Sequence, residues 1–323
     1  MTEFISGFAE DLRGMITMQT ALNYSENTYL DRAKNFDRNC AEHFPDTSVL
    51  TEAVVVSWVR PDAERTDGAF HRKIAFARAF GRYLKSVGKE AYIIPDSYAC
   101  GRNIFVPYLL NNQEISALFR EIDRMEFKRN PFRGVLLSTY FRLTYTCGLR
   151  PGEGRNLKKT DVDLNTGEVR INHTKWHKCR TVVMSEDMRS LMKKYAALRD
   201  LQFPDSEYFF PDTDGGPYTS VRIGKQFKRC FAASKPDTLP ELLPSIRVYD
   251  LRHRFATAVL SRWLDEGTDL SSRLPYLQAY MGHKELESTL YYIHLLPENL
   301  VKAAGIDWEH MNSILPRAEL WEK

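Results

Sequence analysis

Residues 282–294, GHKELESTLYYIH, place a histidine nine positions ahead of a tyrosine, and we take Tyr292 as the candidate centre of a site. A tyrosine phenol loses its proton near pH ~10, so it is a weak nucleophile at neutral pH unless cations and a base lie nearby. Those cations must come from other parts of the chain. Arg150 in TCGLRPGEGRNL and Arg252 in YDLRHRFA are the two leading candidates.

Several short motifs follow one another in order along the last two-thirds of the chain. They are a GLRxxE box, a lysine in a predicted hairpin, an LRHxFA box, a GH box and then the tyrosine. This order resembles the tyrosine recombinase family, the phage integrase and Xer type of DNA strand-exchange enzyme. The segment LPYLQAYMGH, residues 274–283, resembles the corresponding sequence in a branch of integrases found on mobile elements. Each motif alone is weak, and their joint order makes the resemblance specific.

The resemblance implies a role for each motif residue. Tyr292 would attack a DNA phosphodiester, form a 3′-phosphotyrosyl link and release a 5′-hydroxyl. Arg150 and Arg252 would hold the nonbridging oxygens, and His283 would hydrogen-bond to the same phosphate. Lys175 would protonate the leaving 5′ oxygen. No metal, cofactor or nucleotide is expected, because the phosphotyrosine stores the bond energy.

Two further positions flank the arginines. Glu153 stands in the family's acidic position and would orient the guanidinium of Arg150. Tyr249 stands three residues ahead of Arg252, where the family usually has histidine. A neutral phenol can donate one hydrogen bond to a phosphate oxygen but cannot accept a proton at neutral pH. The departure at Tyr249 keeps open a catalytically silent DNA-binding protein of the same fold.

Two choices between neighbouring residues also stay open. Lys178 competes with Lys175 in the same hairpin turn, and Tyr291 lies beside Tyr292. Thr289, three residues ahead of Tyr292, fits the family's box better with Tyr292 as nucleophile.

Length and composition exclude several classes. At 323 residues, with 43% hydrophobic and 12% aromatic residues, the chain should form two domains with sizeable cores. No apolar run approaches the roughly 20 residues of a membrane span, and the acidic start MTEFISGFAEDLRG is unlike a signal peptide, so we expect a cytoplasmic protein without membrane contact. Five scattered cysteines argue against disulfides or zinc, and His173 with His177 lacks a third metal ligand.

The first third of the chain reads as helices, among them AFHRKIAFARAFGRYLKSVGKE. At 100° per residue its apolar side chains fall on one arc, and Arg78, Arg82, Lys85 and Lys89 fall on the other. No acid interrupts this basic stripe before Glu90, and like charges at this spacing repel unless an anion lies alongside. We therefore predict that the stripe contacts DNA phosphates. A merely solvated surface is the alternative.

The rest of the pattern predicts a mostly α fold with a small β-sheet, an α+β class. RGVLLSTYFRLTYTCG reads as a buried helix stopped by Gly148, and Pro151 begins a second. DVDLNTGEVRINHTKWHKCRTVVMSED alternates as strands, with turns at 165–167 and 176–178. The resemblance implies a helical, SAM-like core-binding domain over 1–105 and a catalytic domain over 106–323, with a C-terminal exchange segment from about 298.

The function implied is a site-specific DNA recombinase or integrase that acts on double-stranded DNA at specific recombination sites. Family members assemble as tetramers on DNA, and the apolar tail NLVKAAGIDWEHMNSIL would pack on a neighbouring protomer. Folding back of the tail on its own domain is the ordinary alternative. A type IB topoisomerase-like nicking enzyme, which shares the chemistry but needs no second duplex, is a third reading.

Overall fold

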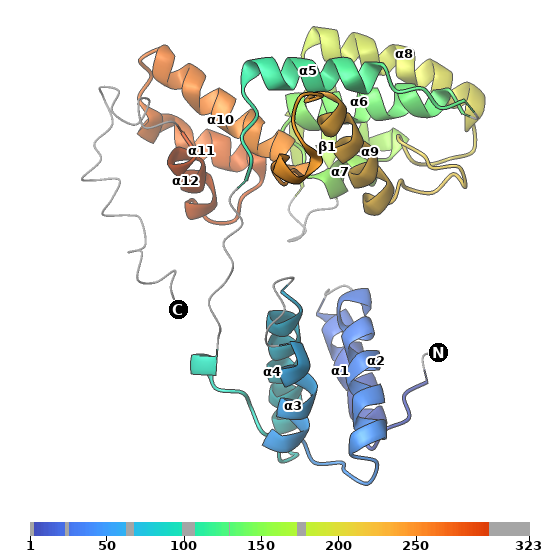
Figure 1. Cartoon of the computed structure of the whole chain (residues 1–323), viewed down its shortest axis with the longest axis vertical. Helices are drawn as coiled ribbons and strands as arrows, with labels where there is room; N and C mark the ends of the chain where they lie inside the picture. Colours follow the sequence, from blue (N-terminus) through green and yellow to red (C-terminus); the bar gives the residue numbers. More distant parts are fainter. Residues whose placement is uncertain are drawn as a thin grey trace. The chain divides into compact units, whose positions relative to one another are not determined.

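The computed structural model describes residues 3–22, 26–62, 68–98, 107–128, 130–172 and 179–296. The chain divides after Phe105 into two compact units, which are described separately (Figure 1). The described residues are 62% helical and form one small two-stranded sheet, so the predicted fold class is confirmed. Within the described ranges, no helix has both the length and the apolar character needed to cross a bilayer.

Within its described residues, the first unit is a bundle of four helices (Figure 1). They are α1 (Ala9–Ala21), α2 (Glu26–His43), α3 (Glu52–Val59) and α4 (Ala69–Ser86), with short 3₁₀ turns η1 (Arg60–Asp62) and η2 (Asp96–Tyr98). Phe36 lies at its centre, with ring centroids of Phe8, Trp58 and Phe80 at 5.7, 5.2 and 5.5 Å. These tilted and edge-to-face contacts between buried aromatic rings hold α4 rigidly in the bundle.

The second unit has eight helices, two strands and two 3₁₀ turns within its described residues. In order these are α5 (Asn112–Asp123), α6 (Phe132–Thr146), α7 (Pro151–Arg155), η3 (Lys159–Asp161), β1 (Glu168–Ile171), β2 (Arg180–Val183), α8 (Glu186–Gln202), α9 (Ser220–Ala233), η4 (Pro240–Leu242), α10 (Tyr249–Asp265), α11 (Leu270–Met281) and α12 (Glu287–His294). In Figure 1, α10, α11 and α12 gather on one side of this unit, and these three helices contact one another.

The sheet is smaller than the alternating pattern of the sequence predicts. β1 and β2 pair antiparallel, from Glu168 opposite Val183 to Ile171 opposite Arg180. The residues ahead of the turn at 165–167 form only one bridge, between Val162 and Val169. The 3₁₀ turn η3 occupies the start of that segment, which leaves too little extended chain for a further strand.

The junction between α6 and α7 depends on a glycine, as predicted. Gly148 has a φ of 58°, and a Cβ at this position would lie 2.4 Å from Cδ1 of Phe255. Because no other residue avoids both the strain and the clash, the turn requires glycine. Pro151 is the first residue of α7, so the turn places Arg150 immediately ahead of a helix start.

A second left-handed glycine ends α11. Gly282 has a φ of 64°, and the backbone N–H of His283 donates to the carbonyl of Gln278 at 3.0 Å. The chain therefore turns sharply back after α11 and leads into α12. This turn sets His283 between the two helices.

Candidate active site

Arg252, in the first turn of α10, is completely buried with 0% of its surface exposed. Its Nη1 donates to the carbonyl of Gly148 at 2.6 Å, and its Nη2 donates to the carbonyl of Met281 at 2.5 Å. The same Nη2 lies 3.1 Å from Nε2 of His283. Arg252 thus joins the ends of α6 and α11. Its buried Nε has no hydrogen-bond partner among the described residues.

Arg150 is the N-cap residue of α7 and stays 26% exposed through its side chain. Its Nη1 donates to Oε1 of Glu153 at 2.7 Å, while its backbone N–H donates to Oε2 at 2.8 Å. Its Nη2 donates to the carbonyl of Gly282 at 2.7 Å. The guanidinium therefore lies beside the turn that carries His283.

Arg180, the first residue of β2, completes this group, although no sequence motif singled it out. Its two Nη atoms donate to both carboxylate oxygens of Glu153, at 2.8 and 2.7 Å, and its Nε donates to the carbonyl of Tyr280 at 2.8 Å. The only signal in the sequence was its place at the start of the second predicted strand. From the sequence alone, an arginine at the start of a strand is expected to be exposed to solvent, because nothing nearby in the sequence indicates its partner Glu153.

The carboxyl group of Glu153 is a firmly ionised anion in this arrangement. Burial raises its pKa, but the hydrogen bonds and charge of Arg180, followed by the hydrogen bonds of Arg150, outweigh burial and lower the pKa to about 2. The pKa of Glu153 in the folded protein lies below its ordinary value of 4.5. The ionised carboxylate therefore stabilises the fold, and this contribution is fully present when the pH is above 4.5. This contribution is lost as the pH falls towards the folded pKa.

His283 is neutral in the DNA-free protein. Burial first, and then the charges of Arg252, Arg150 and Arg180, lower its pKa to about 3. Because Arg252 can only donate, Nε2 of His283 accepts and Nδ1 carries the proton. The partner of Nδ1 is the hydroxyl of Thr289 at 2.8 Å, one turn ahead of Tyr292 on α12. This contact ties the GH turn to the helix that carries the candidate nucleophile.

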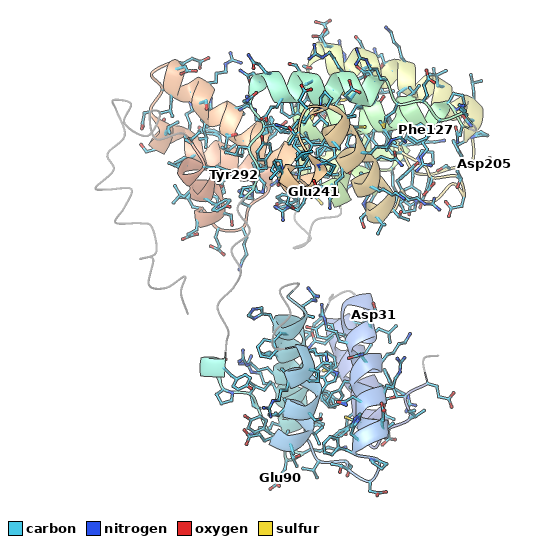
Figure 2. The ribbon with its side chains drawn as sticks, viewed as in Figure 1. Asp31, Glu90, Phe127, Asp205, Glu241 and Tyr292 are labelled. Atoms are coloured by element: carbon cyan, nitrogen blue, oxygen red, sulfur yellow. The ribbon has the colours of Figure 1, made fainter. Side chains whose placement is uncertain are left out.

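Tyr292 lies on α12 (Figure 2), and only 2% of its surface is exposed. Its ring stacks on that of His283, with centroids 5.8 Å apart and planes at 21°, and lies 5.5 Å from the ring of His253. Burial raises the pKa of Tyr292 to about 12, and the positive charge of Arg252 works in the opposite direction. Tyr291 contacts the ring of His253 at 6.2 Å but makes no ring contact with His283 among the described residues.

Tyr249 opens α10 and is half-buried. Its ring centroid lies 5.0 Å from that of His253, which lies in turn beside Tyr292. Burial, and then the charges of Arg247 and Arg252, lower the pKa of His253 to about 4, so this histidine is neutral as well. Tyr249 therefore adjoins the cluster. Burial lowers the pKa of Arg252 and raises the pKa of Tyr292, and Tyr249 adds a smaller upward effect on both pKa values.

Lys175 and its competitor Lys178 lie outside the described residues, as do His173 and His177. The strands that flank them end at Ile171 and begin at Arg180. Since Arg180 contacts Glu153, the strand that follows these lysines is anchored in the cluster.

The described cluster carries three guanidinium groups and one carboxylate, from Arg150, Arg180, Arg252 and Glu153. With Tyr292 and His283 neutral, the net charge of these groups is two positive. A cationic, largely water-excluded site beside a phenol can bind a phosphate diester and stabilise the charge that develops when the phenol attacks it.

The basic stripe lies in the first unit, and Arg78 is used within that unit. Its Nε and Nη2 donate to the carbonyls of Ile94 and Pro95 at 3.0 and 2.8 Å, and its Nη1 lies 3.3 Å from Oδ1 of Asp96. Arg78 thereby fastens the segment after α4 to that helix.

The other end of the stripe is also paired. Nζ of Lys89 lies 2.7 and 2.9 Å from the carboxylate oxygens of Asp11 on α1. Carboxylates from other segments thus lie beside Arg78 and Lys89. The repulsion between like charges that the sequence suggests is therefore already relieved at both ends of the stripe. Arg82 and Lys85 are exposed and form no ion pair within the described part of this unit.

The chain is similar to known proteins in sequence and in fold. Residues 109–299 match the phage integrase family. An integrase/recombinase of Sinorhizobium fredii, y4rB, is 26% identical over 311 residues, which cover 93% of this chain and 96% of the relative. The tyrosine recombinase XerC of Proteus mirabilis is 31% identical over 165 residues, which cover 51% of this chain and 49% of XerC.

Two solved structures have a similar fold. The XerH site-specific recombinase, bound to a palindromic difH substrate in a post-cleavage complex, has a TM-score of 0.63 at 22% identity and covers 88% of this chain and 80% of its own. The Tn1549 transposon integrase, in complex with transposon right end DNA, has a TM-score of 0.61 at 15% identity and covers 94% and 99%. The family match spans more than half of the sequence. The chain belongs to the phage integrase family of tyrosine recombinases.

Proposed function

We propose that this protein is a site-specific recombinase that cleaves and rejoins double-stranded DNA through a 3′-phosphotyrosyl intermediate on Tyr292. The meeting of Arg150, Arg252, His283 and Tyr292, drawn from four separate segments, carries the proposal. Membership of the phage integrase family supports it. So do the DNA complexes of proteins with the same fold.

The arginines bind and activate the phosphate. The forks of Arg150 and Arg252 hold the two nonbridging oxygens, and Nε of Arg252 supplies a donor that is unused in the DNA-free protein. As Oη of Tyr292 attacks phosphorus, negative charge builds on those oxygens and the guanidinium groups stabilise it. The charge of Arg252 also lowers the cost of forming the phenolate.

His283 can change its tautomer when the phosphate binds, because its Nδ1 faces a hydroxyl group. The hydroxyl oxygen of Thr289 accepts a hydrogen bond from Nδ1–H of His283. When Nδ1 carries no proton, the same hydroxyl can rotate and donate a hydrogen bond to it. Nε2 is then free to carry a proton and donate it to a phosphate oxygen. Thr289 thus supports either tautomer of His283.

The bond changes balance without a metal or nucleotide. The bond from Oη of Tyr292 to phosphorus forms, the bond from phosphorus to the 5′ oxygen breaks, and the phenol releases its proton to water, from which the general acid regains the proton that it donates. Lys175 donates a proton to the leaving 5′ oxygen. Attack by a 5′-hydroxyl on the phosphotyrosine reverses each step and reseals the strand.

Tyr249 stabilises charge in this scheme and does not transfer a proton. A properly placed donor is typically worth about 10²- to 10³-fold in rate, so Tyr249→Phe slows cleavage within roughly that range. Tyr249→His, which restores a donor, keeps a rate close to that of the parent. Single-turnover formation of the covalent adduct measures both variants. A phenylalanine variant as fast as the parent would show that Tyr249 only packs against His253.

The first unit acts as the core-binding domain, with α4 following the DNA backbone through Arg82 and Lys85. This assignment rests on the helical bundle and on the two exposed cations.

Replacing Arg82 and Lys85 together with alanine reduces the log–log salt slope of DNA binding by about one unit for each phosphate that the protein no longer neutralises. Fluorescence anisotropy over a salt series measures the slope. Lys89→Ala is the matched control on the same segment, because Asp11 already pairs with that charge. An unchanged slope in the double variant would mean that the stripe is only solvated.

We extend the proposal to assembly and origin. The protein forms a tetramer on two duplexes, with the segment from about residue 298 packing on the next protomer, and it belongs to a mobile element. The apolar side chains of that segment and the likeness to a transposon integrase support these points. An assay for strand exchange between two duplexes separates a recombinase from a topoisomerase-like nicking enzyme, which reseals the same duplex.

The target DNA can be identified from the covalent adduct itself. The protein is incubated with fragmented DNA of its host, the reaction is stopped with detergent, and the covalently attached DNA is sequenced. A recombinase yields one recurring sequence at the attached end. Attachment to no DNA at all, despite retained binding, would favour the catalytically silent reading.

A further inference from the structure

Arg180 is placed to control the charge of the active site through a carboxylate. It is 8% exposed through its side chain and Glu153 is 3% exposed, so their contact is nearly free of water. Arg180 approaches Glu153 with both Nη atoms at 2.8 and 2.7 Å, whereas Arg150 offers that carboxylate only one side-chain donor, at 2.7 Å. The stronger partner of Glu153 is therefore Arg180.

We propose that Arg180 is a positioning residue for DNA cleavage, which neutralises and holds Glu153 so that the charge of Arg150 remains available to the scissile phosphate. The inference rests on the proposed function and adds a residue to it. Without Arg180, Arg150 is the only cationic partner that the described residues offer to the buried carboxylate of Glu153. The pair of Glu153 with Arg150 is then neutral, and the phosphate loses half of the net positive charge described for the cluster.

The contacts of Arg180 also reach the turn that carries His283. Its Nε donates to the carbonyl of Tyr280, near the end of α11. Its guanidinium packs closely on Gly282, where a Cβ would lie 3.0 Å from Nη1. The carbonyl of Gly282 in turn accepts from Arg150. One side chain thus aligns the strand after the lysine hairpin with the α6–α7 junction and the GH turn.

The experiment is a double-mutant cycle on the pair, measured as single-turnover adduct formation at saturating DNA. Arg180→Met removes the charge at similar length, and we expect adduct formation to slow by about 10²-fold, with DNA affinity changed less than about threefold. Removing the carboxylate as well, in Glu153→Gln/Arg180→Met, should restore at least about tenfold of the loss, since no buried anion then competes for Arg150. Arg180→Lys, which keeps the charge but not the fork, should be intermediate.

A matched control pair lies in the same unit. Arg142 on α6 holds Asp123 on α5 with two contacts of 2.8 and 2.6 Å, but this carboxylate is exposed at the surface. Arg142→Met and Asp123→Asn/Arg142→Met should leave the rate of adduct formation within about twofold of the parent. Thermal unfolding of all variants separates loss of rate from loss of fold.

Two outcomes would overturn the inference. One is an Arg180→Met variant as fast as the parent. The other is a folded double variant that recovers none of the lost rate. If Arg180→Met does not fold, the double variant Glu153→Gln/Arg180→Met provides the test. The inference then requires that its rate of adduct formation lie within about tenfold of the rate of Glu153→Gln alone. A parent protein that forms no adduct would instead refute the proposed function itself, so the two failures remain distinguishable.

Discussion

Replacing Tyr292 with phenylalanine abolishes the covalent adduct with DNA and leaves DNA binding nearly unchanged. The substitution deletes one oxygen and no packing volume from a buried ring, so the stacking on His283 is kept. Because the phenolic oxygen forms the bond to phosphorus, no other group in the cluster replaces it. Denaturing electrophoresis of protein with labelled DNA detects the adduct, and anisotropy measures binding.

Tyr291→Phe is the matched control for this experiment. The two residues are adjacent on α12, but among the described residues only Tyr292 stacks on His283. We expect Tyr291→Phe to form the adduct at a rate close to that of the parent. If Tyr292→Phe retains the adduct and Tyr291→Phe loses it, the nucleophile has been assigned to the wrong tyrosine.

The second large effect is expected at Arg252. Arg252→Lys keeps the charge but cannot donate to the carbonyls of Gly148 and Met281 and to a phosphate at the same time. Loss of one positioned donor slows cleavage by about 10²- to 10³-fold. Loss of a buried hydrogen bond also lowers the free energy of unfolding by about 1–3 kcal/mol. Adduct kinetics and chemical denaturation measure the two effects on the same preparation.

Arg262→Lys provides the comparison on the same helix. Arg262 is exposed and pairs with Glu266 one turn later, away from the cluster. Neither adduct formation nor stability should change appreciably in this variant. An Arg252→Lys variant that cleaves at the rate of the parent would contradict the assignment of its guanidinium to the phosphate.

The motif order predicted much of the observed cluster, because each motif combines a candidate site residue with the local turn that positions it. Gly148 and Pro151 indicate the junction that places Arg150, and Gly282 indicates the turn before His283. Local chemistry of this kind is readable from neighbouring residues. The cluster of Arg150, Arg252, His283 and Tyr292 could therefore be anticipated from the order of the motifs alone.

What could not be predicted depends on partners far apart in the chain. Arg180 gains its role from Glu153, 27 positions earlier, and no periodic pattern connects the two residues. The ion pairing of the basic stripe could not be read from the sequence for the same reason, since Asp11 approaches Lys89 from 78 positions away. Ion pairs between distant segments arise from the tertiary fold. Hydrophobic periodicity and local charge spacing carry no information about them.

The most direct test of the proposed chemistry is to map the covalent bond itself. The parent protein is reacted with its recovered DNA site carrying a nick beside the scissile phosphate, so that the short 5′-hydroxyl fragment diffuses away and the intermediate accumulates. Protease digestion and mass spectrometry then identify the attached peptide, and exonucleases of defined polarity identify the DNA end. We predict a 3′-phosphate joined to Oη of Tyr292. Linkage to a 5′ end, or to any other residue, would contradict this mechanism.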